Sequence, residues 1–147
     1  MKTLSESSGA KLKVVVDTNV YIATALRPGS LSDDALRLIY KGYAELYYSN
    51  EILAELKNQL SSERFQIDSK IIQLILGNIE AEGIFVKTLP VEEKRLRDPN
   101  DLHIIECAVA ARANLIITFD KDLLSLKDSH GIGIVHPKSF CWMVADK

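Results

Sequence analysis

The stretch Val14 to Ile22, VVVDTNVYI, places a carboxylate at the end of a run of β-branched residues. Three successive valines favour a buried strand, because branched side chains pack well on a pleated surface that is covered on both faces. Asp17 ends this run, and Thr18 and Asn19 follow it. The pattern predicts a strand over Lys13–Asp17, and its final carboxylate fits two roles equally well, a turn-forming Asx residue or a functional acid.

The chain has the length and the apolar content of one globular domain. Of its 147 residues, 47% are hydrophobic and 26% are charged, and the formal net charge is -2. This balance lacks the basic excess that would announce a nucleic-acid partner. Residues 1–11 are small and polar and are expected to form a flexible lead-in, with a single domain over residues 12–147. The chain shows neither a secretion signal nor an apolar span of bilayer length, which favours a cytoplasmic location and no membrane partner.

Short apolar runs alternate with longer segments of helical period, and this rhythm is typical of parallel strands joined by helices. The expected strands are Lys13–Asp17, Ala44–Tyr48, Ile84–Lys87, Leu115–Thr118 and Ile132–Val135. Between and after them, helices are expected to begin at Ser32, at Ser49 or Asn50, at Asp68, at Asn100, at Asp122 and at Pro137. Gly42 and Gly83 are placed to end two of these helices. The sequence therefore predicts an α/β fold.

Acidic residues follow two of the expected strands, because VVVD ends at Asp17 and IITFD ends at Asp120. The carboxyl ends of parallel strands meet at one edge of a sheet, where α/β proteins form their sites. Asp101 lies in the first turn of the helix before the Asp120 strand, and Glu55 lies about one turn into the helix after the second strand. Alone, Asp101 fits a helix-start role and Glu55 a solvated surface role. Together the four acids predict a carboxylate cluster.

A carboxylate cluster needs compensation, since like charges packed closely cannot all stay ionised. A divalent cation supplies that compensation, and all-oxygen ligands select Mg²⁺ or Mn²⁺ rather than zinc. Such ions bind phosphodiesters, lower the pKa of a bound water and stabilise a leaving oxygen. Direct general-base action by one carboxylate is an alternative. The chemistry indicated by the cluster is hydrolysis of a phosphate ester.

Other kinds of site fit the sequence less well. Cys107 and Cys141 are too few for a disulfide framework or a zinc site, and the three histidines lack zinc-ligand spacing. His103 follows Asp101 by two residues but is expected to have a surface role. The chain contains neither a G-x-x-x-x-G-K-[ST] loop nor a G-x-S-x-G elbow. Phosphatases of the haloacid-dehalogenase type also have an aspartate after the first strand, but they require a second aspartate at the position of Asn19. Asn19 therefore argues against this class of enzyme.

The segments VVVDTNVYIA, EILAEL and RDPNDLHIIECAVAARANLIITFDKDLL resemble the PIN-domain ribonucleases, especially the toxin components of toxin-antitoxin pairs. The likeness extends from about Leu12 to about Phe140, and the order and spacing of the acidic motifs carry it. It implies a three-layer α/β/α fold with a parallel five-stranded sheet in the order 3-2-1-4-5. It also implies an endoribonuclease that depends on Mg²⁺ or Mn²⁺, a homodimer and a cognate antitoxin partner.

The resemblance also assigns roles to single positions. Asp17, Glu55, Asp101 and Asp120 match the family's catalytic and metal-binding acids. The polar residues around them are expected to orient these acids, and they are Thr18, Asn19, Thr118 and Asp98. Phe119 departs from the family, which often has glycine before the last acid, and its bulk is expected to narrow the approach to Asp120.

An RNA substrate requires positive charge near the acids, because phosphate contacts supply most of the affinity that is independent of sequence. Lys94, Arg95 and Arg97 directly precede the DPND motif and are predicted RNA contacts, although a solvated face explains them as well. The leading hypothesis is therefore a metal-dependent ribonuclease. The alternative is a module that keeps the fold and binds RNA or protein without cutting.

Overall fold

The structure is a computed structural model that describes residues 11–145. Except for Lys11, the expected lead-in over residues 1–11 lies outside the described residues. A six-stranded sheet forms the centre, in the order β3-β2-β1-β4-β6-β5. The predicted order is confirmed from β3 through β4, and β6 is the expected fifth strand. The prediction of five wholly parallel strands is wrong at one edge, where β5 adds an antiparallel strand outside β6.

Each strand is short. The parallel strands are β1 (Leu12–Val16), β2 (Ala44–Tyr48), β3 (Ile84–Phe85), β4 (Leu115–Ile117) and β6 (Ile132–Val135), and the antiparallel strand is β5 (Asp128–Ser129). β5 consists of two polar residues and has none of the β-branched enrichment that marks a strand. Its pairing with β6 depends on contacts made elsewhere in the fold, so the sequence pattern could not predict it.

The helices cover both faces of the sheet. They are α2 (Thr18–Leu26), α3 (Leu31–Leu38), α4 (Asn50–Leu60), α5 (Ser69–Glu82), α6 (Leu102–Ala111), α7 (Lys121–Leu126) and α8 (Pro137–Ala145). Two shorter turns complete them, the π-helical η1 (Ile39–Tyr43) and the 3-10 helix η2 (Pro99–Asp101). Helix α2 was not predicted, because its segment TNVYIATAL is apolar on every side and has no amphipathic period.

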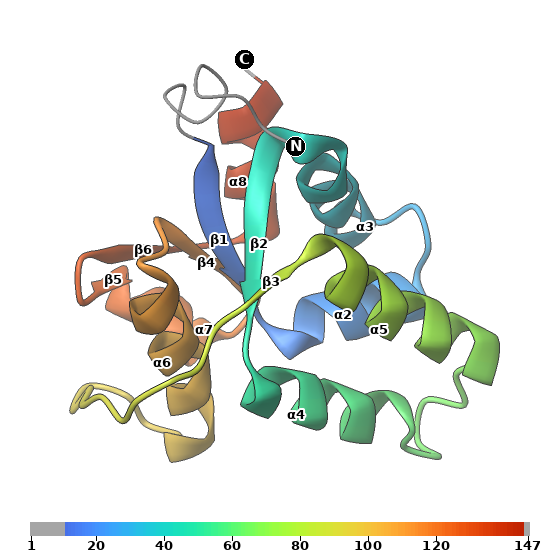
Figure 1. Cartoon of the computed structure of the whole chain (residues 1–147), viewed down its shortest axis with the longest axis horizontal. Helices are drawn as coiled ribbons and strands as arrows, with labels where there is room; N and C mark the ends of the chain where they lie inside the picture. Colours follow the sequence, from blue (N-terminus) through green and yellow to red (C-terminus); the bar gives the residue numbers. More distant parts are fainter. Residues whose placement is uncertain (1–10, 146–147) are drawn as a thin grey trace.

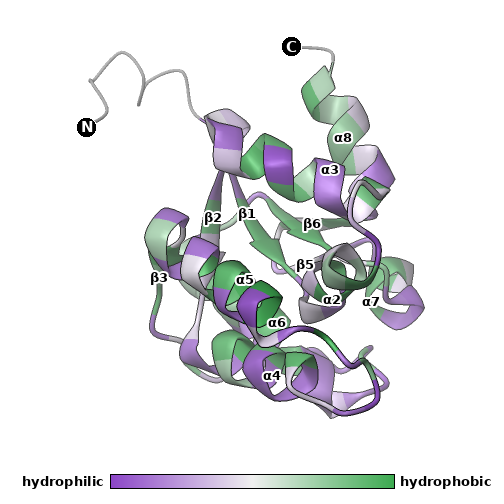
Figure 2. Cartoon of the chain, turned by 90° about the vertical axis from the view of Figure 1, so that its right-hand side faces the viewer, coloured by the Kyte–Doolittle hydropathy of each residue, from purple (hydrophilic) through white to green (hydrophobic). Residues whose placement is uncertain are grey.

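The side chains of β1 divide the core into two layers. Val14 and Val16 pack with residues of α2, α3, α5 and α8. Val15 points to the opposite face and packs with residues of α6 and α7. Figure 1 shows α2, α3 and α5 on the right of β1 and β2, with α6 and α7 on the left. Figure 2 shows hydrophobic strands enclosed between these helices. The three-layer α/β/α arrangement is therefore confirmed.

Several helix starts differ from the predicted ones. Helix α3 begins after Ser30, and Ser32, the predicted start, is buried inside its first turn. The prediction that Asp122 begins α7 is wrong, because the Asp120 side chain accepts hydrogen bonds from the backbone N–H groups of Asp122 and Leu123. In the DPND motif the side chain of Asp98 caps η2, while Asn100 lies within it. At each of these places two residues that can cap a helix lie close together in the sequence. The course of the backbone decides which of the two becomes the N-cap.

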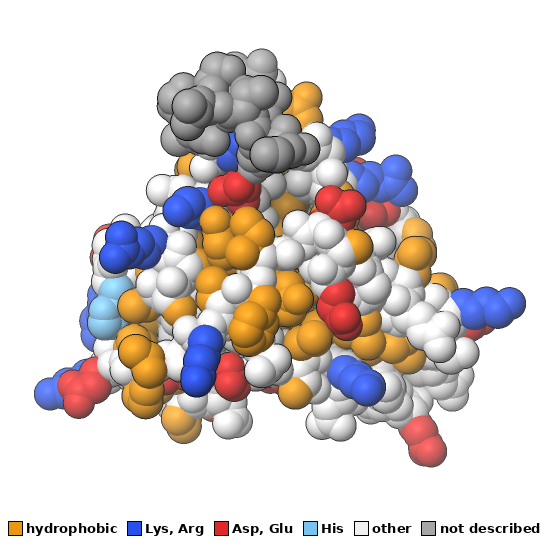
Figure 3. All heavy atoms as spheres, viewed as in Figure 1, with side chains coloured by type: hydrophobic (Ala, Val, Ile, Leu, Met, Phe, Trp, Pro, Cys, Tyr) orange, Lys and Arg blue, Asp and Glu red, His pale blue; other side chains and the backbone are white. Residues whose placement is uncertain are grey.

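The free edge of β3 carries an apolar patch. Ile84 and Phe85 are 42% and 48% exposed, and among residues 11–145 β3 pairs with β2 alone. Figure 3 shows hydrophobic side chains gathered in the middle of this face of the molecule. The brevity of β3 limits the unpaired backbone that this edge offers to another strand.

Within residues 11–145, no helix is long and apolar enough to cross a bilayer.

Leu56 of α4 is packed in the core, so a cavity at this position should strongly lower the stability of the fold. This side chain is 0% exposed and belongs to the cluster between the sheet and α2. We expect Leu56→Ala to lower the free energy of unfolding by about 2–5 kcal/mol, measured by urea denaturation. The control is Leu74→Ala on α5, a side chain that is 63% exposed, which should change stability by about 0.5 kcal/mol or less. Equal effects of the two substitutions would contradict this packing.

Candidate active site at the carboxyl edge of the sheet

The register of the central strands brings the first and last predicted acids together. Val16 of β1 pairs with Ile117 of β4, and the backbone N–H of Asp17 donates to the Ile117 carbonyl at 3.0 Å. Asp17 and Thr118 therefore leave the sheet side by side at its carboxyl edge. Their separation along the chain is 101 residues, so only the parallel pairing of β1 and β4 makes them neighbours.

Asp17 is held inside the protein by its neighbours. The residue is 5% exposed, and the Thr118 hydroxyl donates to its Oδ2 at 2.8 Å. The Thr18 hydroxyl lies 3.5 Å from Oδ1. Although Asp17 occupies the N-cap position of α2, its side chain makes no capping hydrogen bond. Among the described contacts the carboxylate is not used to form a turn, so the structure does not support the Asx interpretation.

Burial raises the pKa of Asp17 above its usual value. The hydrogen bond from Thr118 opposes this rise, while the nearby charges of Asp120 and Glu55 add to it. The Asp17 carboxylate is therefore stabilised by hydrogen bonds from Thr118 and Thr18 and destabilised by both dehydration and like charge. A cation would relieve both of these unfavourable effects.

Asp120 stands at the same edge, three residues after Ile117, the last residue of β4. Its backbone N–H donates to the Thr118 hydroxyl oxygen at 2.9 Å, so Thr118 bridges Asp17 and the Asp120 backbone. Its Oδ1 caps α7. The ring of Phe119 packs edge to face against His136, with ring centroids 5.0 Å apart, and joins the core cluster around α2. The effect expected of Phe119 on access to Asp120 remains a prediction.

Asp101 lies in an environment that disfavours its ionised form. Burial raises its pKa to about 7, and the charges of Asp120, Asp17 and Asp98 contribute to the rise, while His103 opposes it. Within the described residues, its carboxylate has no hydrogen-bond partner. Asp101 therefore shares one electrostatic environment with Asp17 and Asp120, although the three come from distant parts of the chain.

Glu55 reaches the site from α4 and is contacted on both carboxylate oxygens. His103 Nε2 of α6 is in direct contact with Oε2, and Gln59 Nε2 donates to Oε1 at 3.3 Å. The His103 side chain is 19% exposed, so the surface role expected for it is wrong. Sequence reasoning also missed Gln59. Its place four residues after Glu55 on one helix was the available signal.

The residues expected to support the acids behave differently from one another. Thr118 and Thr18 are buried against Asp17. Asp98 caps η2 through its bond with the Asn100 N–H and raises the pKa of Asp101. Asn19 is exposed, and among the described residues its side chain makes no hydrogen bond. The supporting roles of these four residues remain predictions.

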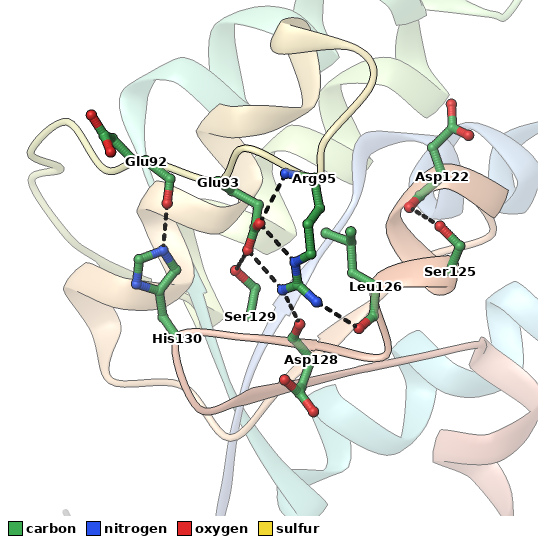
Figure 4. Close-up of polar contacts among 9 residues, drawn as sticks. All are labelled: Glu92, Glu93, Arg95, Asp122, Ser125, Leu126, Asp128, Ser129 and His130. Atoms are coloured by element: carbon green, nitrogen blue, oxygen red, sulfur yellow. Dashed lines mark hydrogen bonds and ion pairs between the residues drawn. The ribbon is translucent and has the colours of Figure 1, made fainter.

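The predicted RNA contacts lie in the linking segment, residues 86–98, between β3 and η2. Arg95 forms an ion pair with Glu93 and donates to the carbonyl oxygens of Asp128 and Leu126 at 2.8 and 3.4 Å, as Figure 4 shows. Hydrogen bonds from Arg95 and Ser129 lower the pKa of Glu93 to about 2. Arg95 therefore fastens the linking segment to β5, a role that the sequence did not reveal.

Lys94 and Arg97 are more open. Lys94 is exposed, and no hydrogen bond or ion pair is formed by its side chain within the described part of the chain. Arg97 is 83% exposed and lies 3.9 Å from the Asp122 carboxylate, in the first turn of the helix that Asp120 caps. The RNA-binding roles of Lys94, Arg95 and Arg97 remain predictions.

The donor chemistry of the four acids fits a hard divalent cation, because carboxylate oxygens are the ligands that Mg²⁺ and Mn²⁺ prefer. Burial is the largest cause of the raised pKa values of Asp17 and Asp101, and the charges of neighbouring acids add to it, so the ionised carboxylates are disfavoured at this edge. In residues 11–145, however, no three Asp, Glu, His or Cys side chains already stand close enough together to hold an ion. The acids thus share a charged edge without forming a closed ligand set, and their metal-binding roles remain a prediction.

The raised pKa of Asp101 predicts a pH-dependent gain in stability when the charge is removed. The folded protein holds this proton up to about pH 7, whereas an unfolded aspartate releases it near 3.8. The contribution of Asp101 to the free energy of unfolding therefore falls as pH rises from about 4 to 7. Asp101→Asn should raise the free energy of unfolding at pH 8 by about 1 kcal/mol, allowing for solvent screening, and the melting temperature by about 2–4 °C.

This gain should shrink towards zero when metal-free protein is melted at pH 4.5. Glu80→Gln, an exposed charge removal on α5, is the matched control and should show no such trend. A gain for Asp101→Asn that is the same at both pH values, or no gain at either, would contradict the proposed charge crowding.

Comparison with known proteins agrees with this architecture. The chain is 30% identical over 124 residues to the uncharacterized protein MJ1680 of Methanocaldococcus jannaschii, which covers 82% of this chain and 78% of that protein. Its fold is similar to a chain in the crystal structure of VapBC2 from Rickettsia felis bound to a DNA fragment from their promoter. That likeness has a TM-score of 0.61 and 19% identity, and covers 85% of this chain and 98% of the other. The PIN domain family matches residues 13–122, so the chain belongs to the PIN domain family.

Proposed function

We propose that this protein is a ribonuclease that uses Mg²⁺ or Mn²⁺ to hydrolyse RNA phosphodiesters. The observation that carries the proposal is the convergence of Asp17, Asp101 and Asp120, whose charges act on one another at the carboxyl edge of the sheet. Glu55 adds a fourth acid, since its charge acts on Asp17. Membership of the PIN domain family supports a nuclease activity of this kind.

In this proposal Asp17, Glu55, Asp101 and Asp120 hold the cation. When bound, it would polarise the scissile phosphate and lower the pKa of an attacking water. Thr118 fixes the Asp17 carboxylate through its 2.8 Å hydrogen bond and so limits its rotation. Direct general-base action is the alternative, in which Asp101, whose pKa is about 7 when no cation is bound, accepts the proton from water instead of holding the ion.

RNA is proposed as the substrate because of the family likeness and the basic residues beside the acids. Lys94 and Arg97 are exposed on the linking segment that leads directly into η2 and Asp101. Their charges would offset the repulsion between an acidic edge and a phosphate backbone. Arg95 contributes less in this proposal, because its guanidinium is engaged by Glu93 and two carbonyl groups.

We further propose that the protein is the toxin of a toxin-antitoxin pair and acts in the cytoplasm as a homodimer. The structural likeness to VapBC2 supports an antitoxin partner. An adjacent reading frame for a small DNA-binding protein would add independent support. The antitoxin would restrain cleavage by covering the acidic edge, since that edge must be open for RNA to reach it.

Removal of single carboxylates tests the nuclease proposal. Purified wild type should cleave single-stranded or structured RNA in the presence of Mn²⁺. Asp17→Asn and Asp101→Asn should each lower the cleavage rate by about 100-fold or more, because each removes a charge from the cluster that would hold the cation. Glu80→Gln, which removes an exposed charge on α5, should cleave at the wild-type rate. Rates are measured from gels of end-labelled RNA.

Two outcomes would reject the proposed mechanism. Equal cleavage by wild type and both aspartate variants would show that the acids are not used. Lack of cleavage by the wild type, with RNA binding retained and no antitoxin copurified, would instead favour a PIN-fold module that binds without cutting.

A further inference from the structure

Glu55 and His103 connect two helices at the edge of the candidate site. Glu55 lies in the second turn of α4 and His103 in the first turn of α6, and Nε2 of His103 is in direct contact with Oε2 of Glu55. The two side chains are 32% and 19% exposed, so the contact is partly sheltered from water. The packing of α4 against α6 thus places an imidazole directly on one of the predicted metal-binding carboxylates.

Glu55 needs such support more than the other acids do. Its side chain has three rotatable bonds, whereas an aspartate has two, and ordering a longer side chain sacrifices more rotamer freedom. Asp17 is already oriented by Thr118, and Asp120 by the backbone of α7. For Glu55 the orienting contacts are His103 on one oxygen and Gln59 on the other.

These contacts leave the carboxylate able to bind a cation. A carboxylate offers about four lone-pair directions, and one contact on each oxygen leaves about two of them available. Carboxylates that bind metal ions are commonly held by hydrogen bonds from residues that do not touch the ion, and loss of such a residue weakens metal binding. Around Glu55, Gln59 donates such a hydrogen bond to one oxygen, and His103 adds a direct contact with the other.

We infer that His103 is a positioning residue that holds Glu55 in place for a divalent cation. The inference rests on the proposed function, because it takes Glu55 as a ligand. His103 would contact neither the RNA nor the reacting phosphate, and would act through its contact with Glu55, beside the smaller effect of its charge on Asp101. Gln59 would have the same role on the other oxygen, but from the same helix, so it cannot fix Glu55 relative to α6.

Isothermal titration calorimetry of Mn²⁺ binding to the purified protein tests the inference without reference to activity. His103→Ala should weaken Mn²⁺ binding by about 10-fold or more. His103→Gln keeps a side-chain N–H donor and should recover most of this loss. The matched control is His130→Asn in the β5–β6 turn, where Asn tolerates the positive φ of 54°, and it should bind Mn²⁺ as the wild type does. Circular dichroism checks that each variant is folded.

A cleavage assay on the same variants supplies a second readout. If His103 acts through Glu55, His103→Ala should lower kcat at a fixed Mn²⁺ concentration and leave the KM for RNA unchanged, with recovery in His103→Gln. A change in KM alone would instead assign His103 to RNA binding and overturn the inference.

The outcomes separate this inference from the proposed function. Weaker Mn²⁺ binding by His103→Ala, with no RNA cleavage by any protein, supports the positioning role and rejects the ribonuclease. Equal or tighter Mn²⁺ binding by His103→Ala, with normal cleavage by wild type, overturns the inference and leaves the ribonuclease standing. Lack of Mn²⁺ binding by wild type, or binding by His103→Gln as weak as that by His103→Ala, also overturns it.

Discussion

Burial of several carboxylates at one edge of the sheet is the constraint on which the rest of the site depends. Asp17 is almost wholly buried, and desolvation is the largest cause that raises its pKa and brings the pKa of Asp101 to about 7, with the charges of neighbouring acids adding to the rise. A fold gains no stability from such an arrangement. Its persistence therefore points to a function, in which a cation or a transferred proton balances the charge.

The surrounding structure restrains this edge from several directions. The parallel pairing of β1 with β4 fixes Asp17 against Thr118, and the start of α7 fixes Asp120. α4 and α6 hold Glu55 between them, while the tie from Arg95 to β5 anchors the segment that leads to Asp101. The Asp101 carboxylate has no hydrogen-bond partner within the described residues, so it is the acid whose side chain is least fixed by its neighbours. Binding of a cation would order it most.

The sequence predicted those parts of the molecule that depend on local pattern. The valine run gave the central strand, and two strands ending in aspartate indicated where the site lies. Helix α2 was not predicted because apolar residues lie on all its sides. Strand β5 was not predicted because its two residues are polar and Arg95 holds the backbone beside them. The contact between Glu55 and His103 depends on how α4 packs against α6. That packing is a tertiary property, and residue spacing on either helix does not contain it.

The acids of this edge act on one another through their charges, and we propose that a divalent cation relieves this repulsion. The most direct measurement is the pKa of the Asp101 side chain, followed by carbon-detected NMR in metal-free protein and again with saturating Mg²⁺. We predict that the pKa of Asp101 is about 7 without metal and falls by a large amount when Mg²⁺ is added. A pKa near 3.8 in the metal-free protein, or a raised pKa that Mg²⁺ does not change, would contradict it.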